Sequence, residues 1–152
     1  GEQAIAIVQG LRKAIGLPDS DTIPDMVATL LRHPGLYEKH ARVGMELLGG
    51  GVLSPRQREL AVLRTAWLCG APFEWGEHVA IARRAGVSDE DIARMIDGSM
   101  ATGWTEEDCA IVSAAEELHE GAMISDAVWD RLTRFLDDAQ MIELVYIVGH
   151  YT

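Results

Sequence analysis

The sequence predicts an all-α fold, a compact bundle of eight or nine short helices. Three observations support this prediction. Hydrophobic residues recur at intervals of three and four, no window alternates with a period of two, and hydroxyl or acidic residues stand where helices would begin. A chain of 152 residues can bury one hydrophobic core, so we expect a single domain over 1–152. The last helix reaches Thr152 without a cap, which leaves open that the natural chain is truncated there.

The first third of the chain predicts three helices. Hydrophobic residues spaced by four indicate a helix that closes at Gly16. A second helix opens at Pro24 and ends before Pro34, because the residue that precedes a proline disfavours helical dihedral angles. A third helix is predicted over about 35–48, and the glycine run 49–51 ends it.

The strongest start signal follows that glycine run. Ser54 precedes a proline, and Gln57 stands three residues after Ser54, which is the pattern of a capping box. The helix that begins there is predicted to reach about Cys69. Pro72 then opens another helix, which Gly86 terminates.

Four more helices are predicted in the remainder of the chain. A hydroxyl or carboxylate side chain that can cap a helix, followed by acidic residues, precedes each of them. The caps are Ser88, Thr105, Ser125 and Asp137.

Composition excludes several classes of function. The 24 acidic residues outnumber the 13 basic ones, for a formal net charge of -11, so nucleic acid and anionic membrane surfaces are poor partners. No apolar run approaches the roughly 20 residues that span a bilayer, and no signal peptide is visible, so we expect a cytoplasmic protein. Cys69 and Cys109 form neither a CxxC pair nor a zinc pattern, and no HExxH motif occurs. We therefore predict no metal and no cofactor.

The densest group of candidate catalytic residues is carried by two neighbouring helices. Glu74 and His78 are four residues apart and share a helix face, and Glu59 on the preceding helix could approach them if the two helices form a hairpin. A carboxylate beside an imidazole makes an oriented base, as proton transfer to and from carbon requires. On spacing alone, a solvated surface pair is the more frequent outcome, so this group by itself does not establish a function.

Three segments carry a resemblance to a known family. LSPRQRELAVLR (53–64), FEWGEHVAIA (73–82) and GVSDEDI (86–92) resemble the carboxymuconolactone decarboxylase and alkylhydroperoxidase D-like superfamily. The similarity covers roughly residues 30–100. It implies an alkylhydroperoxidase D-like helical fold and a homo-oligomer, a trimer or a hexamer.

The resemblance also separates two branches of the superfamily. In the peroxidase branch, a glutamate, a CxxC pair and a histidine form a thiol relay. Glu59 and His78 match its glutamate and histidine, but Ala71 and Glu74 occupy the cysteine positions. A thiol relay needs two adjacent thiols, so CxxC-type peroxidase activity is disfavoured and the chain resembles the decarboxylase branch.

That branch implies a cofactor-free enzyme acting on a small unsaturated lactone or carbonyl acid. By this resemblance, His78 is the general acid and base, Glu74 orients it, and Glu59 tunes it or shares its proton. Arg64 is a candidate anchor for a substrate anion and Trp75 a candidate substrate contact, although such residues are more often solvated and core residues, respectively. The alternative is a non-catalytic, oligomeric ligand-binding or scaffold domain on the same fold.

Overall fold

The computed structural model describes residues 5–6, 9–10, 13, 23 and 25–152. The first predicted helix, which closes at Gly16, lies outside these residues for most of its length. The chain divides into two compact units, residues 1–51 and 52–152, and each is described by itself. The prediction of one domain over 1–152 is not tested by this division and stays a prediction.

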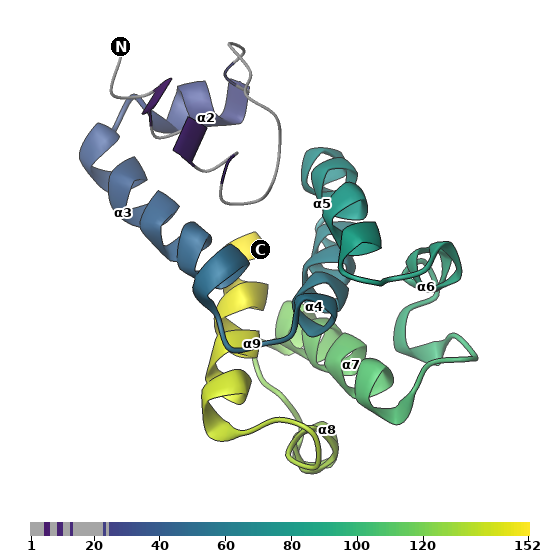
Figure 1. Ribbon diagram of the computed structural model, residues 1–152. Helices are drawn as coiled ribbons and strands as arrows, with labels where there is room; N and C mark the ends of the chain where they lie inside the picture. The colour runs from purple at the N-terminus through teal and green to yellow at the C-terminus, as the bar shows by residue number, and fades with distance from the viewer. Residues whose placement is uncertain (1–4, 7–8, 11–12, 14–22, 24) are drawn as a thin grey trace. The chain divides into compact units, whose positions relative to one another are not determined.

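The first unit contains two α-helices among its described residues. Helix α2 spans Asp25–Leu30 and helix α3 spans Pro34–Met45 (Figure 1). The His33 side chain caps α3 by accepting a hydrogen bond from the Leu36 amide. The observed helix therefore begins at Pro34, one residue before the predicted start at 35. Its last turns also differ from the prediction. From Glu46 to Gly50 the backbone winds as a π-helix, η1, before Gly51 leaves it in an extended conformation.

The second unit is also helical throughout, and its helices begin where the sequence predicts. Ser54, Ser88 and Asp137 each form a complete capping box, while Thr105 and Ser125 cap with their hydroxyls. The elements are α4 (Pro55–Leu68), α5 (Pro72–Arg84), α6 (Asp89–Arg94), η2 (Gly98–Met100), α7 (Glu106–Gly121), α8 (Asp126–Leu132) and α9 (Asp138–Tyr151). From Asp25 onward the chain contains eight α-helices, and no strand occurs among the described residues, so the all-α prediction is confirmed.

Helix α4 is the centre of this unit. It packs against α5, α7 and α9 (Figure 1), and all of its residues from Glu59 to Ala66 are buried. Because neighbours cover α4 on several sides, any polar residue in this stretch must find its partners inside the protein.

The turn between α4 and α5 makes these two helices a hairpin. Gly70 follows the α4 cap with a φ of 59°, in the left-handed region that glycine tolerates without strain. Pro72 then occupies the first position of α5, where its missing amide hydrogen costs nothing. The hairpin brings the N-terminal part of α4 toward the C-terminal part of α5.

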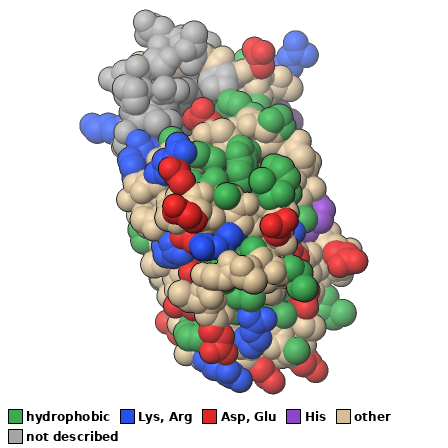
Figure 2. All heavy atoms as spheres, turned by 90° about the vertical axis from the view of Figure 1, so that its right-hand side faces the viewer, with side chains coloured by type: hydrophobic (Ala, Val, Ile, Leu, Met, Phe, Trp, Pro, Cys, Tyr) green, Lys and Arg blue, Asp and Glu red, His purple; other side chains and the backbone are tan. Residues whose placement is uncertain are grey.

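One face of the molecule mixes charges of both signs. Figure 2 shows acidic and basic side chains intermingled on one face, with exposed hydrophobic side chains gathered in its upper half. Within the described residues, no helix has the length and hydrophobicity needed to cross a membrane.

Candidate functional site

The candidate site begins with a carboxylate at the centre of the fold. Glu59 lies on α4, between Arg58 and the apolar residues 60–63, and has no exposed surface. One of its oxygens accepts a hydrogen bond from Arg58 Nε at 2.8 Å, and the other lies 2.8 Å from His78 Nδ1. A buried carboxylate is costly unless such contacts compensate for its lost hydration, so Arg58 and His78 together permit Glu59 to lie there.

The imidazole partner comes from the second helix of the hairpin. His78 lies on α5 and only 5% of its side chain is exposed. When Nδ1 carries the proton, it donates to Glu59 Oε2, which fixes the tautomer and the plane of the ring. Nε2 is then the unprotonated nitrogen of the ring, the one able to accept a proton. We call Glu59 and His78 the dyad.

The last helix adds a residue that the sequence did not single out as catalytic. The ring of Tyr151 meets the His78 ring edge-on, with centroids 4.9 Å apart and planes at 87°. Burial raises the pKa of the Tyr151 phenol above its usual value, and the negative charges of Glu59 and Glu74 raise it further, against a smaller opposing effect of Arg58. Tyr151 is therefore a protonated hydroxyl beside the dyad. No local pattern identifies it, because only the packing of α9 brings it to His78.

Of the two carboxylates predicted near His78, Glu59 is the one that contacts the ring. Glu74 is half-buried, four residues before His78 on α5, and its charge acts on Tyr151. No hydrogen bond joins Glu74 to His78 within the described part of the chain, whereas Glu59 makes that contact from α4. The reason is tertiary, since the hairpin supplies a carboxylate at the Nδ1 side of the ring.

Arg64 has buried partners of its own. It is buried, and its guanidinium pairs with Glu116 of α7 at 2.9 Å and donates to the main-chain oxygen of Met95. Glu116 in turn accepts hydrogen bonds from Ser99. These contacts tie α4 to α7 and to the segment after α6, and they involve neither Glu59 nor His78.

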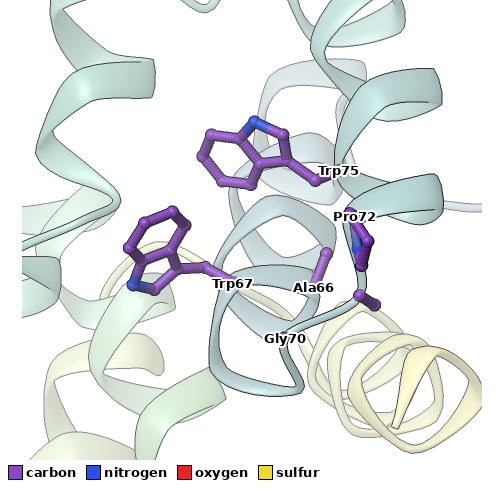
Figure 3. A pocket seen from close by; sticks show the side chains of 6 residues that line it. Ala66, Trp67, Gly70, Pro72 and Trp75 are labelled. Atoms are coloured by element: carbon purple, nitrogen blue, oxygen red, sulfur yellow. The ribbon is translucent and has the colours of Figure 1, made fainter.

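Trp75 lines a pocket at the corner of the hairpin. Its ring lies 5.4 Å from that of Trp67, with the planes inclined at 58° (Figure 3). The pocket has a volume of about 440 Å³ and neither member of the dyad lines it. We call it the corner pocket; its lining residues are Ala66, Trp67, Gly70, Ala71, Pro72 and Trp75.

The thiols and the metal-binding side chains form no further centre among the described residues. Cys69 and Cys109 are free, with Cys69 3.6 Å from His119 Nδ1 and Cys109 3.6 Å from the Ser99 carbonyl oxygen. In the same residues, no group of three or more His, Cys, Asp or Glu side chains is arranged to hold a metal ion.

Comparison with known proteins places the chain in a family. The family model described as "Carboxymuconolactone decarboxylase family" matches residues 34–117, more than half of the chain, and this range contains both members of the dyad. A comparison with curated protein sequences finds no match.

Two solved structures share the fold. A protein of unknown function from Agrobacterium tumefaciens, a candidate antioxidant defence protein AhpD, is 18% identical with a TM-score of 0.72, over 81% of this chain and 85% of that one. The debrominase Bmp8 in its apo form is 15% identical with a TM-score of 0.76, over 98% of this chain and 78% of that one. At these identities the similarity establishes the fold alone, and it confirms the predicted alkylhydroperoxidase D-like architecture.

Proposed function

Because the chain belongs to the carboxymuconolactone decarboxylase family, we propose that it is a cofactor-free enzyme that transfers a proton to or from carbon. The observation that carries the proposal is the buried contact between His78 Nδ1 and Glu59 Oε2. Its substrate class is a small unsaturated lactone or carbonyl acid.

The dyad suits this chemistry because it separates two tasks. Glu59 holds the ring and balances the positive charge that His78 gains when Nε2 is protonated. In a decarboxylation, the carboxylate of the substrate leaves as carbon dioxide, and the electron pair of the broken bond delocalises onto the carbonyl oxygen. His78 then gives the Nε2 proton to the carbon and regains one from solvent.

The oxyanion that forms in this step needs a hydrogen-bond donor. The Tyr151 ring contacts the imidazole and its raised pKa keeps the hydroxyl protonated, so we assign it as the candidate donor. Glu74, whose charge acts on Tyr151, is assigned an electrostatic role and does not orient the ring.

A second candidate function has its own supporting observation. The dyad is almost fully buried, and the corner pocket is lined by apolar residues and not by the dyad. This arrangement favours a non-catalytic, oligomeric ligand-binding or scaffold domain, in which the dyad only ties α4 to α5.

Deuterium exchange distinguishes the two candidates even while the substrate is unidentified. Small unsaturated lactones and β-keto acids are incubated with the protein in D₂O, and deuterium at carbon is followed by NMR. We expect His78→Ala to slow exchange by about 100-fold or more and Tyr151→Phe to slow it less. The matched control is His119→Asn, at an exposed histidine that lies within hydrogen-bond distance of the Cys69 sulfur, and this variant should retain the wild-type rate. If His78→Ala exchanges as fast as the wild type, the catalytic proposal is wrong and the scaffold candidate stands.

A further inference from the structure

The corner pocket exists because the α4–α5 turn is built from small residues. Ala66 and Ala71 carry single methyl groups, and Gly70 has none. The two indoles form the walls, and in Figure 3 they extend from α4 and α5 toward the same side of the hairpin. The small residues thus leave open a hollow beside the two indoles, which lie against each other with their ring centroids 5.4 Å apart.

The lining is chemically uniform. None of the six lining residues is charged, and the indole N–H groups are the only polar side-chain groups among them. Trp67 remains 43% exposed, although an indole gains free energy from contact with apolar groups. Two inclined π-faces in a lining without charged side chains suit a flat, uncharged ring, and no lining residue offers a positive charge to a carboxylate or a phosphate.

We propose that the corner pocket binds a neutral planar ring, aromatic or conjugated, against Trp67 and Trp75. The volume of about 440 Å³ holds a one- or two-ring compound, since small-molecule pockets span about 300–1,000 Å³. The net charge of -11 further disfavours an anionic ligand. This inference stands on the pocket alone and does not require that the dyad be catalytic.

The indole N–H signals provide a direct test. The chain has four tryptophans, and Trp104 and Trp129 do not line the pocket. Coumarin, a neutral planar lactone, is titrated into ¹⁵N-labelled protein. We expect the signals of Trp67 and Trp75 to move while those of Trp104 and Trp129 stay. Coumarin-3-carboxylate, which adds one charge to the same ring system, should bind at least about tenfold more weakly.

Three variants locate the binding site. Ala71→Leu fills the pocket and Trp67→Ala removes one wall, so each should weaken coumarin binding about tenfold. Trp129→Ala is the matched control, because Trp129 is 45% exposed on α8, about as much as Trp67, and lies outside the pocket. Circular dichroism checks the folding of each variant, and Trp67→Ala decides if Ala71→Leu does not fold.

Several results would overturn the inference. They are the absence of any shift, equal shifts of all four indole signals, equal binding of the charged analogue, or wild-type affinity in the folded pocket variants. Binding by His78→Ala at wild-type affinity, together with unchanged deuterium exchange, would refute the proposed function and leave the pocket inference standing.

Discussion

The contact between Glu59 and His78 should be a strong, measurable coupling. A hydrogen bond to a charged group contributes about 1.5–3 kcal/mol to the free energy of unfolding when it is shielded from water. The two side chains are 0% and 5% exposed and their bonded atoms are 2.8 Å apart. We therefore expect a coupling free energy of about 2 kcal/mol between Glu59→Gln and His78→Asn.

A double-mutant cycle isolates this contact from its neighbours. Glu59→Gln also disturbs the bond from Arg58, and His78→Asn also removes the ring that meets Tyr151. Both losses cancel in the coupling term, because each is present with and without the other substitution. The free energy of unfolding of the four proteins is measured by urea denaturation at pH 7.

An exposed ion pair at the same distance provides the control cycle. Arg83 Nε and Asp89 Oδ1 are also 2.8 Å apart, but their side chains are 58% and 72% exposed. Solvent screens that pair, so its coupling should stay under about 1 kcal/mol. A coupling for Glu59 and His78 below about 0.5 kcal/mol, or no larger than the control, would refute the claim that burial makes this contact strong.

Three further predictions concern stability. Burial acts to raise the pKa of Asp91, but its hydrogen bond with Arg56 lowers that pKa below 3.8, so Arg56→Met should lower the free energy of unfolding by about 2–3 kcal/mol near neutral pH. In acid denaturation, the difference between the variant and the wild type should shrink as the pH falls below 3.8, and a constant difference would contradict the pairing. The pKa of Tyr151 lies above the usual tyrosine value of 10.0, so above about pH 10 the unfolded chain loses this proton more readily than the folded protein, and the wild type should lose stability relative to Tyr151→Phe. Parallel alkaline unfolding curves of the two proteins would contradict this prediction. A methyl group at Gly98, where φ is 66°, would meet the Arg64–Glu116 pair, so Gly98→Ala should lower the free energy of unfolding by about 2–4 kcal/mol. Gly76 faces open space on α5, so Gly76→Ala should raise the free energy of unfolding by up to about 1 kcal/mol. Thermal melts that rank the two variants in the opposite order would refute this reasoning.

Local sequence was enough to place the start of most helices. Ser54, Thr105 and Asp137 accept hydrogen bonds from backbone amides three residues ahead, so each start depends only on nearby residues. The all-α class follows from the same local signals and from the spacing of hydrophobic residues. The end of α3 was less predictable, because its winding into η1 leaves no distinctive residue pattern.

Which side chains meet, in contrast, depended on the packing of the helices. Spacing along α5 favoured Glu74 as the partner of His78, yet the hairpin places Glu59, 19 residues away, at that position. Likewise, the sequence offers Arg64 as a candidate anion anchor, and only the packing shows that it pairs with Glu116, 52 residues away. Tyr151 reaches the dyad from the final helix, and the corner pocket depends on how two helices diverge at a turn of small residues. Capping is a short-range hydrogen bond that the local sequence encodes, whereas a site assembled across helices depends on rotations and crossings that the whole core sets.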